Sequence, residues 1–315
     1  EAHTCHVYFE DAECQIEQDK QIADRLLKKL CLPFIFNKRP EWDKFAGAHY
    51  TISIDVLMPS GRTLQLGSIH QYKDNFSKPY EITYETEEGT HAHVHQTTYG
   101  MSERILGAIV GIHGDNTGLI LPPDVAPIQI VIVPIIFKGK EKIVLDTCHS
   151  VAETLSDKGL RVYVDQRDIN PGNKFYDWEL KGVPIRIEIG PRDISNNQVV
   201  LVSRDTGEKQ SVIMDELVQT IDLSLDEISH RLLDRAQRLL DEKTHVLTDL
   251  DEAKTYEGII QLPWCGTDSC ALEVEEILDG NTLGEPIEKD EQITNKQCVF
   301  CGKQATSWMR FAKTY

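Results

Sequence analysis

The stretch TTYGMSERILGAIVGIHGD, residues Thr97 to Asp115, is the most informative part of the chain. A glycine turn at Gly100 leads into a helix of small residues, and this helix carries a single arginine, Arg104, in its first turn. Alone, such an arginine is weak evidence for a binding site, since most exposed arginines make only surface ion pairs. Two further motifs later in the chain make the interpretation of this stretch more specific.

Two further signals appear in a fixed order. DQRDINPGNKFYDWELKGVPIRIEIGPRD spans Asp165 to Asp193, and four cysteines are arranged as Cys265-x4-Cys and Cys298-x2-Cys. Together the three signals resemble the prolyl-tRNA synthetases of the archaeal and eukaryotic type, over nearly the whole chain. The resemblance implies a multidomain protein of α/β and α+β class. It would contain a partial class II synthetase core on an antiparallel sheet, an α/β anticodon-binding domain and a small α+β zinc-binding C-terminal domain.

Length and charge set limits on these expectations. The 315 residues have room for two or three domains. A net charge of −18 argues against non-specific binding of nucleic acid, which needs clustered Lys and Arg. Lys158 to Lys209 differs, because nine basic residues there balance eight acidic ones, so an RNA backbone is expected in this middle third. The cysteine pattern favours a reducing, cytoplasmic compartment, and the longest apolar run is too short to cross a bilayer.

Local patterns predict the elements of the first domain. Short β-rich runs between turn signals, TISIDVLM, RTLQLGSI, YEITYE and a run from Val94, predict a mostly antiparallel sheet. Before them, Cys14 to Leu30 predicts an amphipathic helix. Its apolar face is expected to contain Ile16, Ile22, Ala23, Leu26, Leu27 and Leu30.

The pattern changes after a proline cluster at residues 122–127. Residues 128–136 predict a strand buried on both faces and 141–158 a helix, and the runs RVYV, IRIEI and VVLVS alternate with a helix near 175–180. This alternation predicts an α/β domain. Ser224-x-x-Glu has capping-box spacing and is expected to begin a long helix and the third domain. The domains are expected at residues 1–123 (class II core), 124–223 (anticodon-binding) and 224–315 (zinc-binding).

Amino-acid activation requires attack of a carboxylate on the α-phosphate of ATP. A site for it must neutralise the phosphates and hold the reactants in line. By the resemblance, Arg104 contacts the ATP phosphates as the catalytic residue, and magnesium is the cofactor of the reaction. Ser68 stands where family members often have threonine, and both supply a hydroxyl. The implied ATP-binding residues are Gln65, Ser68, Ser102 and Arg104.

Proline has a small apolar ring and a secondary ammonium. Its pocket should combine a close aromatic or imidazole wall with one carboxylate. By the resemblance, Phe45 and His70 are the walls, His3 lies beside them, and Glu1 supplies the carboxylate. Taken alone, Phe45 is more simply a core residue and His70 a hydrogen-bonded strand histidine.

Three alternate histidines, His91, His93 and His95, suggest a second interpretation. On a strand they would face one side and could bind a metal. The resemblance instead makes this segment the strand that enters Gly100, and this interpretation is favoured.

The middle block is expected to read the anticodon. Unstacked bases of RNA loops are read by side chains of fixed geometry, and a carboxylate with an arginine matches the edges of guanine. Proline anticodons carry adjacent guanines. By the resemblance, the anticodon-binding residues are Glu179, Arg186, Arg192 and Lys209.

The cysteine pairs predict a structural zinc site. Two closely spaced pairs brought together by a turn give the four thiolates that zinc prefers, and no coordination position remains open for catalysis. Free thiols are the alternative, because 27 residues separate the pairs. The ligands are expected to be Cys265, Cys270, Cys298 and Cys301.

The resemblance therefore implies an ATP-dependent ligase that forms prolyl-adenylate from L-proline and transfers proline to tRNA(Pro). The intact enzyme is expected to be a homodimer without a membrane partner. The first class II motif and the arginine of the second are expected before Glu1, so these residues alone are expected to be catalytically incomplete. Residues 3–100 are too few to include an inserted editing domain. The alternatives are a threonyl or histidyl synthetase and a non-catalytic tRNA-binding relative.

Overall fold

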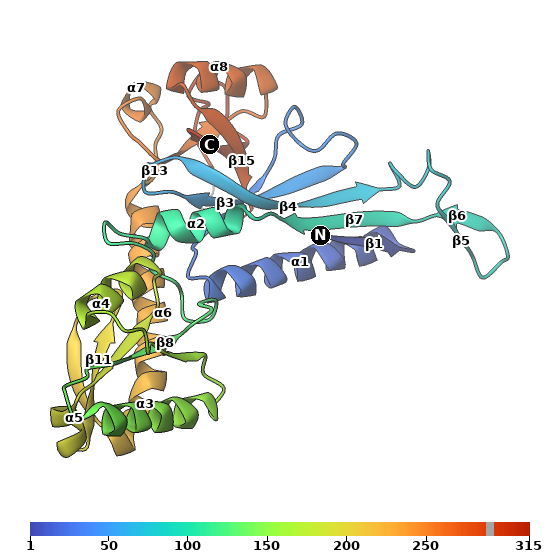
Figure 1. Ribbon diagram of the computed structural model, residues 1–315. Coiled ribbons are helices and arrows are strands. Elements are labelled where there is room, and N and C mark those ends of the chain that lie inside the picture. Colours follow the sequence, from blue (N-terminus) through green and yellow to red (C-terminus); the bar gives the residue numbers. More distant parts are fainter. Residues whose placement is uncertain (288–292) are drawn as a thin grey trace. The chain divides into compact units, whose positions relative to one another are not determined.

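A computed structural model gives the fold and describes residues 1–287 and 293–315 (Figure 1). Its backbone contacts group the chain into two compact units. Unit 1 comprises Glu1–Lys28, Leu32–Ala108 and Gln237–Tyr315, and unit 2 comprises Lys29–Cys31 and Ile109–Ala236. The first and last parts of the chain therefore fold together. No helix among the described residues has the length and apolarity needed to cross a membrane.

Unit 1 is built on a sheet in which nine strands of the described chain pair. In sheet order they are β1 (Ala2–His6), β7 (His95–Met101), β4 (Thr63–Lys73), β3 (Tyr50–Leu57), β2 (Ile35–Lys38), β15 (Asn281–Pro286), β16 (Ser307–Ala312), β14 (Ile259–Trp264) and β13 (Thr244–Val246). Neighbours are antiparallel except β13 with β14. The predicted antiparallel sheet is confirmed, and the pairing of β2 with β15 extends it into the C-terminal segment.

Helix α1 (Phe9–Lys29) is the predicted amphipathic helix, and it begins five residues earlier than expected. Figure 1 shows it running beside β4 and β7. The prediction of its buried face was wrong for Ile22 and Leu26, which are exposed. The helix contacts the sheet along a narrow stripe. Ile22 and Leu26 directly precede the buried Ala23 and Leu27, but they point away from this stripe and remain exposed to solvent. The buried positions are Ala12, Ile16, Asp19, Ala23 and Leu27.

The remaining elements of unit 1 are short. The hairpin strands β5 (Thr83–Glu85) and β6 (His91–His93) pair with each other, and the first half of the run YEITYE is a turn rather than a strand. Helices α7 (Leu250–Ala253) and α8 (Asp268–Leu278) pack on the C-terminal strands. Trp42, from the loop after β2, packs against this C-terminal core.

Unit 2 contains a mixed five-stranded sheet. Its strands, in sheet order, are β12 (Lys209–Ile213), β11 (Gln198–Ser203), β10 (Ile185–Ile189), β8 (Ile130–Pro134) and β9 (Val162–Val164). β8 is parallel to both of its neighbours, and the other pairs are antiparallel. The other elements are α2 (Arg104–His113), α3 (Glu141–Ser156), α4 (Pro171–Leu180), α5 (Pro191–Ser195), η1 (Met214–Glu216) and α6 (Leu217–Glu242), of which α2 and α6 also extend into unit 1.

Strand β8 is buried on both faces, as predicted. Ile130 and Ile132 belong to a core formed with α3 and α6, whereas Val131 and Val133 pack with Trp178 of α4. This alternation follows from the two-residue repeat of a strand. The predicted α/β arrangement of this part of the chain is therefore confirmed.

The prediction that Ser224 begins the long helix was wrong. Helix α6 begins at Leu217, and the Ser224 hydroxyl donates to the Thr220 carbonyl over 2.7 Å inside it. A serine bonded to the carbonyl four residues earlier is compatible with a helix interior. The capping-box spacing alone does not distinguish a serine at the start of a helix from a serine in its interior.

Candidate functional site

Two polar residues of β4 and an aromatic group form the first candidate site. Ser68 and His70 alternate along the strand and so share a face, with Ser68 Oγ 2.8 Å from His70 Nε2. The other ring nitrogen of His70 lies 2.9 Å from Thr51 Oγ1. The rings of Phe45 and Tyr72 lie 4.9 and 5.8 Å from that of His70, centroid to centroid. Burial lowers the pKa of His70, so its imidazole is neutral at neutral pH.

Strand β1 brings a carboxylate into this region. His3 and His70 are both register partners of Thr98, one on each side of β7. The His3 ring lies 3.0 Å from Thr98 Oγ1 through Nδ1 and 2.9 Å from Glu1 Oε1 through Nε2. Burial lowers the pKa of His70, and the charge of Glu1 acts against this shift, which places the carboxylate within electrostatic reach. The structure therefore brings all four predicted proline-binding residues together.

Arg104 begins α2 and lines a cavity of about 340 Å³ together with Gln65. Its Nη1 donates to the Gln65 carbonyl over 3.4 Å, and its backbone N–H donates to Ser102 Oγ over 3.3 Å. Ser68 is the register partner of Gly100 at the end of the strand pair that leads to α2. Of the four predicted ATP-binding residues, Gln65 and Arg104 line the cavity, Ser102 contacts Arg104, and Ser68 contacts His70.

Close backbone approach explains one glycine of this site. A Cβ on Gly67 would lie 2.3 Å from the carbonyl oxygen of Gly100, so a larger residue there would separate β4 from β7. The C-terminal residue Tyr315 lines the same cavity as Arg104, and its hydroxyl lies 2.8 Å from Ser60 Oγ. The end of the chain is thus part of the cavity that holds Arg104.

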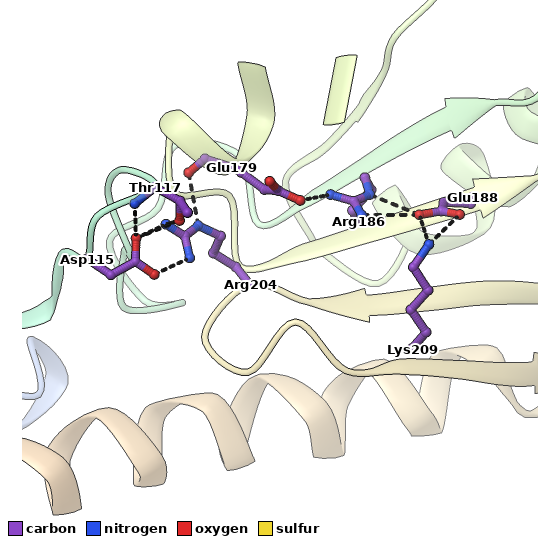
Figure 2. A network of polar contacts seen from close by, with 7 residues as sticks. All are labelled: Asp115, Thr117, Glu179, Arg186, Glu188, Arg204 and Lys209. Carbon is purple, nitrogen blue, oxygen red and sulfur yellow. Dashed lines mark hydrogen bonds and ion pairs between the residues drawn. The ribbon is translucent and has the colours of Figure 1, made fainter. Parts of the chain in front are cut away.

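A second cavity, of about 350 Å³, lies in unit 2 and is lined by three predicted residues, Glu179, Arg186 and Lys209. Arg186 Nη1 lies 2.8 Å from Glu179 Oε1. Glu188 contacts both cations, at 3.2 Å from Arg186 and 3.0 Å from Lys209 (Figure 2). The Arg186 guanidinium also lies 4.2 Å from the ring centroid of Phe175. A carboxylate, a guanidinium and an aromatic face are therefore close together.

The fourth predicted residue, Arg192, is not among those that line this cavity. It lies on α5 and is exposed. Two contributors were missed at the sequence level. Glu188 follows Arg186 by two on β10 and shares its face, and Phe175 precedes Glu179 by four on α4, so the strand and helix repeats could have identified both.

Helix α4, which forms one wall of this cavity, is hydrogen-bonded to the buried residue Asp165. Asp165 accepts from the indole Nε1 of Trp178 over 2.8 Å, and its backbone carbonyl accepts from Lys174 Nζ over 2.9 Å. Burial alone would raise the pKa of the Asp165 carboxyl, but hydrogen bonds from Arg167 and Trp178 outweigh it and lower that pKa to about 2. The charged carboxylate therefore fixes α4 against the sheet at neutral pH.

The four predicted cysteines come together in unit 1. The sulfur atoms of Cys265, Cys270, Cys298 and Cys301 all lie within 4.8 Å of one another. A tetrahedron with zinc–sulfur bonds of about 2.3 Å has edges of about 3.8 Å, and the sulfurs of Cys265 and Cys301 are 3.7 Å apart. Although burial opposes it, hydrogen bonds from Thr267 and the neighbouring thiols lower the pKa of Cys265 to about 6. The donor set fits a thiolate-binding metal ion.

The alternative metal site, at the three alternate histidines, has no support in the geometry. His91 and His93 belong to β6, whereas His95 begins β7. Among the described residues, the four cysteines are the group whose ligand atoms gather closely enough for a metal.

Comparison with known proteins covers the same three regions. Residues 1–113 match the family described as tRNA synthetase class II core domain (G, H, P, S and T), residues 129–222 the Anticodon binding domain, and residues 247–315 Prolyl-tRNA synthetase, C-terminal. The proline–tRNA ligase of Thermococcus kodakarensis is 50% identical over 321 residues, which cover 100% of this chain and 67% of that protein. The chain belongs to the proline–tRNA ligase family.

Other members of the proline–tRNA ligase family give the same result. That of Pyrococcus horikoshii is 51% identical and that of Sulfurisphaera tokodaii 40%, each over 100% of this chain and 67% of the relative. The resemblance inferred from the sequence is thereby confirmed. Each set of candidate residues falls within one matched region: the Arg104 and His70 sets in the class II core, the Arg186 set in the anticodon-binding domain and the cysteines in the C-terminal region.

Proposed function

We propose that this chain activates L-proline with ATP and transfers it to tRNA(Pro). The observation that carries the proposal is the arrangement around His70. Its ring lies beside Phe45, and His3, which contacts Glu1, lies across Thr98 from it. A neutral imidazole and an aromatic face suit the apolar ring of proline, and the Glu1 carboxylate can pair with its secondary ammonium. The region therefore offers proline apolar ring faces and a charge opposite to that of its ammonium group.

In the proposed reaction, a carboxylate oxygen of proline attacks the α-phosphorus of ATP. The new oxygen–phosphorus bond forms prolyl-adenylate as the bond to pyrophosphate breaks. Arg104 binds the phosphates and stabilises the charge that develops on them, and Gln65, Ser68 and Ser102 hold the nucleotide. Magnesium ions, when bound with ATP, would add positive charge at the phosphates. A hydroxyl of the terminal ribose of the tRNA then attacks the carbonyl carbon of the adenylate, and the bond to AMP breaks as the ester to tRNA forms.

The cavity around Arg186 is proposed to bind guanines of the anticodon. Glu179 accepts hydrogen bonds from the N1 and N2 groups, and Arg186 donates to O6 and N7. Phe175 offers a face on which a base can stack. Lys209 adds positive charge near the RNA backbone, and Arg192, exposed on α5, contacts an adjoining nucleotide.

Three further properties belong to the same proposal. The four-cysteine cluster holds a structural zinc ion, the enzyme works as a homodimer, and it acts in the cytoplasm. The core, anticodon-binding and zinc-binding domains are proposed at residues 1–123, 124–223 and 224–315.

Amino-acid-dependent exchange of pyrophosphate into ATP by the full-length protein tests the proposal. Exchange is expected with proline and not with threonine or histidine. Exchange with either of those amino acids instead of proline would identify a different class II specificity. Binding of tRNA(Pro) without exchange for any amino acid would favour a non-catalytic relative.

A further inference from the structure

Arg204 lies outside the set of side chains that read bases in the proposed function, yet it is the most heavily bonded arginine beside the anticodon cavity. Its side chain is only 5% exposed. Its Nε donates to the carbonyl of Glu179 over 2.9 Å, and its Nη atoms donate to both oxygens of Asp115, over 2.8 and 2.9 Å (Figure 2). A fourth hydrogen bond, from Nη2, reaches Thr117 Oγ1 over 2.9 Å. One guanidinium thus joins two segments that are about sixty residues apart in sequence.

The Asp115 partner is itself held in place. Its carboxylate accepts from the backbone N–H and hydroxyl of Thr117 over 2.8 and 2.6 Å and from the N–H of Gly118 over 3.1 Å. The hydrogen bonds from Arg204 hold the pKa of Asp115 well below its usual range, so the carboxylate is charged at any physiological pH. The turn at Asp115–Gly118 is consequently a rigid, charged partner for Arg204.

The chain after this turn packs directly on the end of α4. The N–H of Leu119 donates to the Leu180 carbonyl over 3.0 Å. Gly118 has φ +144°, and a Cβ there would lie 2.5 Å from Leu180 Cα. Gly182 has φ +71°, and a Cβ there would lie 2.7 Å from Leu119. These two backbones approach so closely that only glycine fits at both positions.

The end of α4 is therefore held from two sides. The Arg204 guanidinium, referred to below as the Arg204 fork, binds it on one side, and the backbone of residues 118–121 binds it on the other. Glu179 is the next-to-last residue of this helix, and its carboxylate makes the 2.8 Å contact with Arg186. A cation on the carbonyls of a helix C-terminus is also favoured by the helix dipole. Any loosening at this point moves the Glu179 carboxylate relative to Arg186.

We propose that Arg204, acting with Asp115, is a positioning residue for anticodon recognition: it fixes Glu179 at the distance from Arg186 that one guanine requires. The inference rests on the proposed function of this cavity. Removal of the fork is expected to reduce discrimination between bases, because the reading groups remain present but lose their fixed separation. A residue that only stabilised the domain would not change this discrimination in folded protein.

The test compares anticodon stem-loops of tRNA(Pro) in which one guanine at a time is kept or replaced by adenine. In Arg204→Lys the positive charge remains but the planar fork is lost. The preference for guanine at one position is expected to fall by about tenfold, while proline-dependent pyrophosphate exchange stays unchanged. Asp115→Asn, which keeps the turn's shape, is expected to lower the same preference.

Arg161→Lys is the matched control. Arg161 belongs to the same unit, and its side chain donates to the backbone carbonyls of Pro123, Asp124 and Ala126 rather than to α4. It is expected to leave the preference for guanine unchanged. All variants are compared at a temperature where thermal unfolding shows them folded. If Arg204→Lys does not fold, the guanine preference measured for Asp115→Asn alone tests the inference.

Different outcomes of these experiments would refute the proposed anticodon site and the proposed role of Arg204. Absence of any guanine preference in the unmodified protein would refute the proposed anticodon site. A preference in the unmodified protein that survives both Arg204→Lys and Asp115→Asn would refute the role of Arg204. A double-mutant cycle adds a second criterion: Glu179→Gln and Arg204→Lys should be non-additive, and additive effects would also refute the inference.

Discussion

The Arg186 guanidinium and the Glu179 carboxylate lie 2.8 Å apart, although one belongs to a strand and the other to a helix. Arg186 is 7% exposed and Glu188 contacts it from a second side, so the charge is largely removed from water and fully paired. Such a pair is costly to break from one side only, because the remaining charge stays buried. The cavity is therefore pre-organised before any RNA binds.

Replacement of Arg186 should affect the cognate anticodon selectively. Arg186→Ala is expected to weaken binding of the cognate stem-loop by about 1–3 kcal/mol, because the donors to O6 and N7 are lost. Binding titrations with stem-loops that contain or lack the guanine measure the effect. Arg161→Ala serves as the control. An equal loss on every stem-loop would mean that Arg186 contacts only the RNA backbone.

Arg104 should be required for chemistry but not for tRNA binding. Arg104→Ala in the full-length protein is expected to abolish proline-dependent pyrophosphate exchange, because the charge at the ATP phosphates is no longer neutralised. Arg25→Ala is a suitable control, since Arg25 is exposed on α1, binds the Gln21 carbonyl and does not line the Arg104 cavity. Exchange at the normal rate in Arg104→Ala would remove this residue from the active site.

The cysteine cluster should hold one zinc ion per chain. Elemental analysis of the purified protein is expected to find this stoichiometry and to find it lost in Cys298→Ser, because three thiolates bind zinc more weakly than four. Cys148→Ser, at a buried thiol outside the cluster, should keep the metal. A fully folded protein without metal would contradict the proposed site.

The sequence predicted individual helices and strands better than it predicted which distant segments contact each other. Strand β8 and helix α3 were foreseen because their apolar patterns are local. The joining of Glu285 to Lys38 was not foreseen, because strands 247 residues apart carry no sequence signal of their pairing. Arg204 was missed for the same reason: its partner Asp115 is 89 residues earlier. Glu188 could have been found, since it alternates with Arg186 on one strand.

Trp42 belongs both to the C-terminal core and to the wall of the cavity that contains Arg104. Its ring lies 6.4 Å from that of Trp264, which precedes Cys265. Trp42→Ala is expected to raise the KM for ATP several-fold with less effect on kcat, because the cavity loses part of its wall. Trp42→Phe, which retains an aromatic ring, should largely restore the KM. Equal effects on KM and kcat would indicate general destabilisation instead.

His113 should make stability depend on pH. It is fully buried in unit 2, its Nε2 lies 3.2 Å from the Leu30 carbonyl, and its Nδ1 has no hydrogen-bond partner among the described residues. Burial lowers its pKa to about 4, the Leu30 carbonyl opposes this shift, and the charge of Arg235 adds to it. Protonation of Nδ1 in the folded state would place an unpaired donor and a charge in the core.

The sign of the effect follows from linkage. Between pH 6.5 and 4 the unfolded chain binds a proton at this residue and the folded chain does not, so stability falls as the pH falls through this window. At pH 5 the loss relative to pH 7 is expected to be about 2 kcal/mol. Urea unfolding at both pH values, followed by a signal from unit 2, measures the difference. His113→Gln, which can still donate to Leu30, should remove most of it, whereas His149→Gln, at an exposed position on α3, should leave it unchanged. A pH dependence that persists in His113→Gln would show that another group causes it.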